Sequence, residues 1–494
     1  MKCKVLLPLM IAILVPFSSA AQPPAVKRLD GSTISPAEID ATVTRLMKAA
    51  EVTGVEIAIL NDGRVAYMKS YGLRDKEKNL PLTPDSVMTA ASLTKSTFAY
   101  MVMQLVQEKV IDLDKPVYEY LPKPLPEYAN YRDLAGDERY KKITARMLLS
   151  HTAGFPNLRY FTDDHKLNIN FEPGSRFAYS GEGILLLQLV VETVTGKPLE
   201  ELMQSRVFQP LGMTRSSMTW QPRFEGDYAN GYDEYERSIG PQRRPTADAA
   251  GSMQTTLRDF ARLLQAVTNG ELLQKQTREL MLSPQVQIFS KHEFPSLATE
   301  TTDENKGIRL SYGLGWGLYF TPYGKAFFKE GHTDGFRNYT VCFDRQGTGI
   351  VILTNSSNGE GIFKDLLETL IDNTYTPIEW ELYTPYDKLP PRPPLVVHKE
   401  VTIDPKSLDG YVGRYIFTPD VALTITRAGG THLFVQEFVR ESGEPKQELA
   451  PEGDRKFFST TADDEFTFEV DSHGRATKMV LHTDGRDLAM KRAD

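Results

Sequence analysis

The stretch Ser92-Leu93-Thr94-Lys95 opens a predicted helix whose apolar side chains recur at helical spacing as far as Leu105. If Ser92 stands at the helix start, the i, i+3 spacing brings Lys95 onto its face, where the helix dipole favours developing negative charge. A serine hydroxyl needs an adjacent base to act as a nucleophile, and a lysine of lowered pKa can supply one. The same four residues also fit a serine N-cap followed by a solvated lysine, so position must decide between the two interpretations.

Five further segments occur around this one in a definite order. Together with Ser92–Lys95 they resemble the serine β-lactamase and penicillin-binding protein family, particularly its class C-like branch of esterases and D-peptidases, and the likeness covers about Ala41 to Asn373. The segments are Leu148-Leu149-Ser150-His151-Thr152-Ala153-Gly154, Phe177-Ala178-Tyr179-Ser180-Gly181, Pro210-Leu211-Gly212-Met213, Tyr312-Gly313-Leu314-Gly315-Trp316 and Gly331-His332-Thr333-Asp334-Gly335.

The resemblance implies a role for each matching residue. Ser92 corresponds to the acylated serine, Lys95 to its lysine partner and Tyr179 to the tyrosine of the Y-x-N motif. Lys and Tyr have unperturbed pKa values near 10, so we expect both to be lowered in a working proton-transfer pair. The remaining implied site residues are His332 at the cationic position of the K-T-G or H-x-G motif, Thr333 as its hydroxyl, and the backbone N–H groups of Ser92 and Gly335 as the oxyanion hole.

Two positions depart from the pattern of the family. Gly181 stands where Y-x-N has the asparagine that holds the substrate's amide, and Asp334 adds a carboxylate after Thr333. Without that asparagine, an amide next to the scissile bond loses a donor and an acceptor. We therefore expect short-chain esters to be preferred over penicillins and cephalosporins, and Gly181→Asn to narrow the difference.

The other elements predict an α+β fold for residues 30–388. Asn61-Asp62-Gly63 joins two β-rich runs and is typical of a hairpin turn. The resemblance implies a β-lactamase/transpeptidase-like domain, an antiparallel sheet flanked by helices plus an all-helical region. The predicted strands are 55–60, 65–71, 339–343 and 349–353, and the further predicted helices are 183–194, 257–267 and 363–370.

A second domain is expected after a proline-rich linker at residues 389–400. Leu389-Pro390-Pro391-Arg392-Pro393-Pro394 favours an extended spacer with few inter-domain contacts. Short β-rich runs follow in residues 401–494, separated by glycine-containing turns, and predict a small barrel or sandwich similar to the lipocalin-like domain of some relatives. The runs are 411–417, 421–427, 433–440, 466–470, 476–482 and 487–491.

The N-terminus and the composition limit location and partners. Residues 1–20 have Lys2 and Lys4, an apolar run and Ser18-Ser19-Ala20, which predicts a signal peptide and a periplasmic or secreted protein; the alternative is a membrane anchor. No later stretch is expected to span a membrane.

The composition limits the partners. With 57 Lys and Arg against 65 Asp and Glu, nothing favours nucleic-acid binding. No zinc-ligand cluster occurs, no cofactor is expected, and the oligomeric state stays open.

These observations predict an exported serine hydrolase that cleaves an ester or amide of a small molecule or peptide through a Ser92 acyl-enzyme. Alternatives are a β-lactamase or D,D-/D-amino peptidase acting on cell-wall-type substrates, and a catalytically silent peptide-binding protein. His151 is interpreted as a structural hydrogen-bonding residue, Trp316 as core, and Cys342 as an inert buried thiol.

Overall fold

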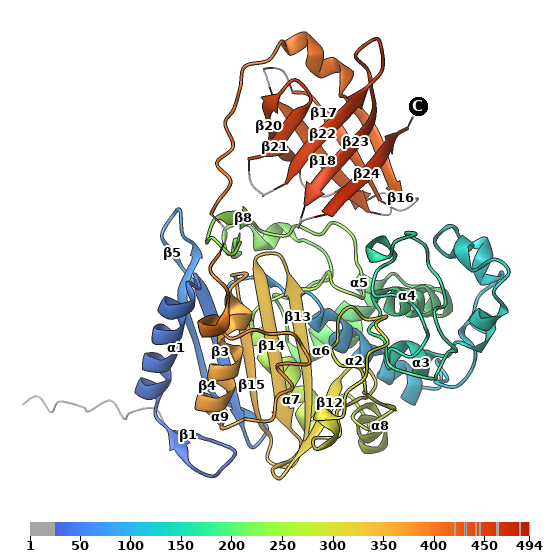
Figure 1. Ribbon diagram of the computed structural model, residues 1–494. Helices are drawn as coiled ribbons and strands as arrows, with labels where there is room; N and C mark the ends of the chain where they lie inside the picture. Colours follow the sequence, from blue (N-terminus) through green and yellow to red (C-terminus); the bar gives the residue numbers. More distant parts are fainter. Residues whose placement is uncertain are drawn as a thin grey trace, which may run out of the picture.

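The computed structural model has a large α+β domain and a smaller barrel domain above it in the view of Figure 1. It describes residues 25–392, 394–418, 421–428, 430, 432–439, 442–443, 446–460, 464–483 and 486–493. The predicted signal peptide lies outside these residues. Within them, none of the helices combines the length and apolar character that crossing a bilayer requires.

A nine-stranded antiparallel sheet forms the centre of the large domain. The predicted hairpin is present, because β3 and β4 pair around Asp62-Gly63, and the predicted pairing of β14 with β15 is confirmed. In spatial order the strands are β10 (Val286–Gln287), β11 (Ser311–Tyr312), β12 (Gly317–Thr321), β13 (Gly324–Thr333), β14 (Phe336–Phe343), β15 (Thr348–Thr354), β3 (Gly54–Asn61), β4 (Arg64–Asp75) and β5 (Leu80–Pro81).

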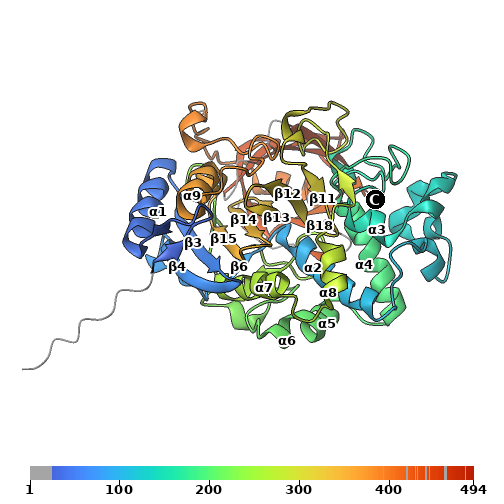
Figure 2. The same cartoon turned by 90° about the horizontal axis from the view of Figure 1, so that it is seen from below.

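Helices cover both faces of this sheet, which explains why its central strands are apolar throughout. Successive side chains of a strand point to opposite faces: Ile57 and Ile59 pack in one core cluster, whereas Ala58 and Leu60 pack in the other. In Figure 2, α1 and α9 lie on one side of the sheet and α2 and α7 on the other. Their bounds are α1 (Pro36–Ala50), α9 (Phe363–Ile371), α2 (Leu93–Gln107) and α7 (Leu257–Asn269).

A mainly helical region extends from the α2 side of the sheet. Its longest helix, α4, begins at Gly181 and ends where Gly196 adopts a left-handed φ of 67°, close to the predicted helix end at residue 194. The helices on this side are α3 (Ala145–Leu149), α4 (Gly181–Thr195), α5 (Leu199–Met203), α6 (Gln209–Leu211) and α8 (Lys275–Met281). Short strand pairs complete the domain: β1 (Val26–Lys27) with β2 (Thr33–Ile34), β6 (Met88–Thr89) with β9 (Gln254–Thr255), and β7 (Gly231–Tyr232) with β8 (Ser238–Gly240).

The C-terminal domain is a closed eight-stranded barrel, so the predicted barrel is confirmed. It closes where β17 pairs with β18, and it has its own apolar core. Two of its strands, β20 and β21, were not predicted, because one is polar and contains Pro451 and the other has four residues. The strands are β16 (Gly413–Thr418), β17 (Val421–Thr426), β18 (Leu433–Val439), β20 (Gln447–Gly453), β21 (Lys456–Ser459), β22 (Glu465–Val470), β23 (Ala476–Thr483) and β24 (Arg486–Arg492), with the short β19 (Ser442–Gly443) beside β18.

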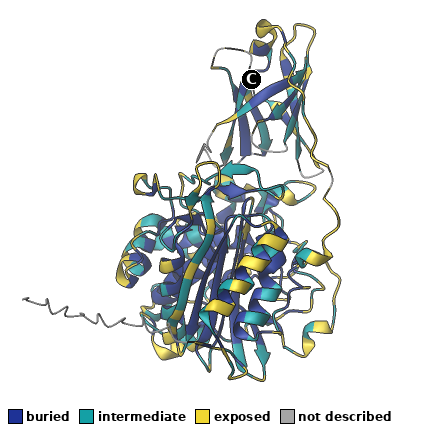
Figure 3. Ribbon diagram, turned by 90° about the vertical axis from the view of Figure 1, so that its left-hand side faces the viewer, coloured by how far each residue is buried: buried dark blue, intermediate teal, exposed yellow. Residues whose placement is uncertain are grey.

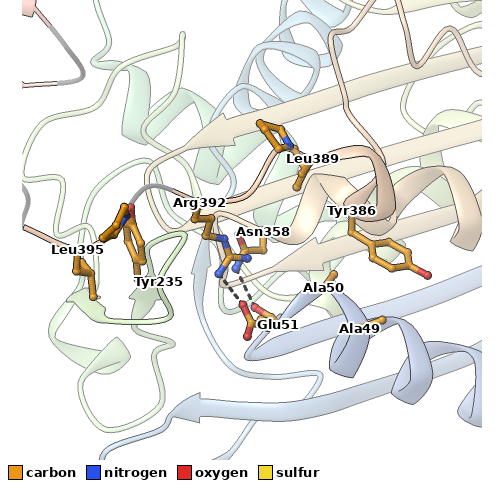
Figure 4. A pocket seen from close by; sticks show the side chains of 11 residues that line it. Ala49, Ala50, Glu51, Tyr235, Asn358, Tyr386, Leu389, Arg392 and Leu395 are labelled. Atoms are coloured by element: carbon orange, nitrogen blue, oxygen red, sulfur yellow. Dashed lines mark hydrogen bonds and ion pairs between the residues drawn. The ribbon is translucent and has the colours of Figure 1, made fainter.

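The linker is largely exposed (Figure 3), yet it touches the large domain. Arg392 Nη1 lies 2.6 Å from Glu51 Oε2 at the end of α1, beside a cavity of about 510 Å³ that the linker helps to line (Figure 4). The barrel makes contacts of its own. The ring centroids of Phe417 and His165 lie 4.5 Å apart, and the guanidinium carbon of Arg486 lies 5.5 Å from the ring centroid of Phe161. The large domain is therefore contacted by the spacer through Arg392 and separately by the barrel itself.

Candidate active site

Ser92 immediately precedes α2, at the position that the sequence predicts. Its side chain makes no capping hydrogen bond, and within the described part of the chain its backbone N–H has no acceptor. The residue before it, Ala91, has a φ of 47°, a strained left-handed conformation for a residue with a Cβ. Strain of this kind persists where the surroundings enforce it, often at functional sites. Within the described residues, the N–H of Ser92 is thus available to bind a ligand.

Lys95 is buried one turn into α2 and faces Ser92. Its Nζ donates to Ser92 Oγ at 2.9 Å and to the Ala250 carbonyl oxygen at 2.6 Å. Burial, followed by the nearby charge of Lys329, lowers the pKa of Lys95 to about 7. A substantial fraction of Lys95 is therefore neutral at physiological pH, as a general base requires.

Tyr179 is the second side chain, after Lys95, that contacts the Ser92 hydroxyl. It lies just before α4, is buried, forms a hydrogen bond with Ser92, and places its ring centroid 5.0 Å from Lys95 Nζ. Burial raises the pKa of Tyr179 well above its usual value, and the negative charge of Glu330 adds to the rise. The expectation of two lowered pKa values therefore holds for Lys95 and not for Tyr179, because burial favours the neutral form of each. This pair has a neutral base and a protonated acid.

Lys329 is a site residue that sequence reasoning missed. It lies on β13 with a fully buried side chain, and its Nζ donates to the Tyr179 hydroxyl at 3.1 Å. It also forms a close ion pair with Glu330, which balances its charge inside the protein. Lys329 is thus the cation that contacts the tyrosine.

A sequence signal for Lys329 was present. Lys329-Glu330-Gly331 has the first and third residues of K-T-G, three positions before the His332-Thr333 pair that the resemblance selected. The glycine of this triplet is required by packing, since a Cβ on Gly331 would lie 2.4 Å from the Ala90 carbonyl oxygen. This close approach brings β13 against the segment that leads into Ser92.

His332, Thr333 and Gly335 lie at the end of β13 but differ in what they contact. His332 is half exposed, and its Nδ1 lies 3.2 Å from Glu360 Oε2. Thr333 Oγ1 accepts a hydrogen bond from Gln242 Nε2 at 3.0 Å. The Gly335 N–H donates to Ser357 Oγ at 3.0 Å and would have to leave it to bind an oxyanion.

The backbone of His332 is better placed than its ring to meet a substrate. Thr333 pairs with Phe336 across a two-residue turn, and residues that flank such a turn form a hydrogen-bonded pair. Because the pairing alternates along an antiparallel ladder, His332 directs its N–H away from β14. The neighbouring strand β12 leaves that edge unpaired after Phe328. The His332 N–H is therefore a second donor candidate beside that of Ser92.

Gly181 is the first residue of α4, and it is followed by a buried ion pair. Its N–H donates to Asn157 Oδ1 at 3.1 Å. Glu182 binds Arg159 in bidentate fashion, with Nε–Oε1 and Nη2–Oε2 distances of 2.9 and 2.8 Å, and both side chains are more than nine-tenths buried. Gly181, where the sequence departs from Y-x-N, and the following Glu182 thus hold a loop that carries Asn157 and Arg159.

The three residues given structural interpretations are all buried. His151 Nδ1 accepts from the Ser180 N–H at 3.2 Å, and burial holds the pKa of His151 well below its usual value. Trp316 is fully buried in the core. Burial raises the pKa of the Cys342 thiol to about 12, which makes it a poor nucleophile.

Among the described residues, one group has side chains and spacing suited to a metal ion, and it lies in the barrel. Ligand atoms of His398, Glu452 and Glu465 fall within 4.8 Å of one another. Lys456 Nζ lies 2.8 Å from an oxygen of each glutamate, so an ammonium group already balances these carboxylates. This group lies apart from Ser92 and plays no part in its chemistry.

Comparisons with known proteins agree with this geometry. Residues 39–372 match the family described as Beta-lactamase, and residues 397–492 match a domain of unknown function, DUF3471. Penicillin-binding protein 4* of Bacillus subtilis is 23% identical over 463 residues, covering 86% of this chain and 92% of that protein. Esterase EstB of Burkholderia gladioli is 29% identical over 222 residues, covering 40% of this chain and 54% of that protein.

A solved structure has the same fold. The octameric penicillin-binding protein homologue from Pyrococcus abyssi superposes with a TM-score of 0.56 at 21% identity, covering 93% of this chain and 100% of that one. At this identity the likeness concerns the fold alone. The family match, by contrast, spans well over half of the sequence and includes Ser92, Lys95, Tyr179 and Lys329. The chain therefore belongs to the Beta-lactamase family.

Proposed function

We propose that this protein is an exported serine hydrolase that cleaves an ester or amide through an acyl-enzyme on Ser92. The observation that carries the proposal is the contact of Lys95 Nζ with Ser92 Oγ at 2.9 Å, made by a lysine whose pKa is lowered to about 7. Export rests on the sequence of residues 1–20. The penicillin-binding protein and esterase relatives support hydrolysis of an acyl bond, and they are compatible with either an amine or an alcohol as the leaving group.

In the acylation step, Ser92 Oγ attacks the carbonyl carbon while its proton passes to Lys95 Nζ. The oxygen of the tetrahedral intermediate lies within reach of the Ser92 N–H and, at the open edge of β13, of the His332 N–H. Each such donor typically contributes ~10²–10³ in rate. Tyr179 donates its proton to the departing oxygen or nitrogen, and the Lys95 ammonium returns a proton to Tyr179. Water then releases the acyl group by the reverse proton path.

The experiment is covalent labelling of the protein with a fluorophosphonate. We expect one adduct on intact protein, mapped to Ser92 by peptide mass spectrometry, and none in Ser92→Ala. Ser96→Ala is the matched control: this serine lies on the same helix and its hydroxyl bonds the Leu93 carbonyl oxygen. It should label like the wild type. Absence of an adduct on correctly folded wild-type protein would overturn the proposal in favour of a silent peptide-binding protein.

The substrate class is a separate question within this proposal. Esters, D-peptides and β-lactams all present a carbonyl carbon to the same nucleophile. A panel of p-nitrophenyl esters, D-aminoacyl anilides and a chromogenic cephalosporin would rank them by kcat/KM. Efficient cephalosporin hydrolysis would favour a β-lactamase, and anilide cleavage a D-peptidase.

A further inference from the structure

We propose that Asn157 supplies the carboxamide that the sequence lacks at Gly181, and that it binds an amide carbonyl of the substrate's acyl chain next to the scissile bond. The inference rests on the proposed acyl-enzyme chemistry and concerns which acyl groups this site selects. It assigns a substrate-binding role to a loop residue outside the sequence motifs.

The loop places Asn157 directly against the start of α4. Its Oδ1 accepts the Gly181 N–H at 3.1 Å, and its backbone oxygen accepts the Glu182 N–H at 2.9 Å. Gly181 is two residues after Tyr179, whose hydroxyl bonds Ser92. The Asn157 carboxamide therefore lies beside the position that the asparagine of Y-x-N would occupy.

The orientation of this carboxamide is determined by its contact with α4. A backbone N–H can only donate, so the atom facing Gly181 is the oxygen, and the amide nitrogen points the other way. Within the described part of the chain, Asn157 Nδ2 has no hydrogen-bond acceptor, and it is not enclosed by protein. One end of the group is fixed and the other offers two N–H donors. A substrate carbonyl oxygen is the complementary partner.

Glycine at position 181 is what permits this approach. A Cβ there would lie 3.0 Å from the Asn157 backbone oxygen, 3.2 Å from Leu158 Cδ2 and 3.3 Å from Asn157 Oδ1. The departure from Y-x-N thus makes room for an asparagine from another segment. Gly181→Asn would push this loop away, so the expectation that it restores amide recognition does not follow from the structure.

Glu182, the residue that follows Gly181, fixes the same loop. Its carboxylate holds the Arg159 side chain and also accepts the Arg159 N–H at 3.0 Å, while Ser180 Oγ donates to the Pro156 carbonyl oxygen at 2.8 Å. Asn157 lies between these two anchors. A group held in place before binding loses less conformational entropy when the substrate arrives. Glu182 and Arg159 are therefore positioning residues for Asn157.

The experiment compares two esters of equal acyl length in each variant. p-Nitrophenyl N-acetylglycinate has an amide next to the scissile carbonyl, whereas p-nitrophenyl pentanoate has methylene groups there. Asn157→Asp keeps an oxygen for the Gly181 N–H and removes the donor, and Asn157→Ser removes the carboxamide without adding charge. The measured quantity is the ratio of the two kcat/KM values. The intrinsic reactivities of the esters cancel when variants are compared.

We expect both Asn157 variants to lower the ratio of N-acetylglycinate to pentanoate at least tenfold. Asn170→Asp is the matched control: its Nδ2 donates to the carbonyl oxygens of Gly154 and Asn168 in the same region, so its loss should leave the ratio within twofold. A ratio unchanged in both Asn157 variants, or equal losses on both esters, would overturn the inference while Ser92 labelling persists. No hydrolysis of either ester together with no labelling would overturn the proposed function, and this inference with it.

Discussion

The charge on Lys329 is expected to set the pH at which the enzyme becomes active. The pKa of Lys95 is lowered from 10.5 to about 7 by burial and then by the positive charge of Lys329, while Glu330 acts in the opposite direction. A lysine base works when neutral, so kcat/KM should rise with pH through a midpoint near 7. Lys329→Met removes one positive charge and should move this midpoint upward.

The size of the shift follows from the geometry. The Nζ atoms of Lys95 and Lys329 lie 5.0 and 4.7 Å from the centroid of the same Tyr179 ring, so they are less than about 10 Å apart. At an effective dielectric constant of about 20, two unit charges at ~10 Å interact by about 1.7 kcal/mol. One pKa unit corresponds to about 1.4 kcal/mol. Because about 10 Å is an upper limit on the separation, we expect the midpoint of Lys329→Met to rise by at least about one pH unit.

The assay measures the rate of Ser92 labelling by an uncharged fluorophosphonate from about pH 5 to 10, where no substrate charge enters the profile. Glu330→Gln should move the midpoint downward, because it removes a negative charge that stabilises protonated Lys95. Lys325→Met, at the other end of β13 beside Asp344, is the control and should leave the midpoint unchanged. A wild-type midpoint near 10, or shifts of the same sign in the Lys329 and Glu330 variants, would refute the reasoning.

Further predictions concern catalysis, stability and domain independence. Tyr179→Phe should lower kcat/KM at least ~10², because it removes the proton donor to the leaving group; a loss below tenfold contradicts that role. Glu182→Ala should cost ~3–5 kcal/mol in urea unfolding, because it leaves a buried guanidinium without its bidentate partner; a change within error contradicts this. Gly315→Ala should lower Tm, because φ is 85° and the new Cβ would meet another methyl group at 2.2 Å, whereas Gly307→Ala, with open space, should not. A chain ending at Leu389 should stay soluble and label with fluorophosphonate, because the barrel has a separate core; an insoluble product would indicate that the barrel completes the large domain.

Local sequence determined the elements of this protein and its nucleophile. The Asp62-Gly63 turn and the β-rich runs on either side specify a hairpin through short-range backbone preferences, and Gly196 ends α4 for the same kind of reason. Ser92 and Lys95 are one helical turn apart, so their contact follows from helix geometry. Such features depend on neighbours within a few residues and can be recognised in a sequence alone.

Tertiary structure decided which distant groups complete the site. Lys329 reaches Tyr179 across 150 residues of chain, and Asn157 replaces a missing side chain 24 residues away, because the sheet and the Glu182–Arg159 pair bring these segments together. The same burial that lowers the pKa of Lys95 raises that of Tyr179, an outcome that depends on solvent exclusion and on nearby charges. Sequence spacing contains neither quantity, since desolvation and Coulomb interaction depend on distances in space.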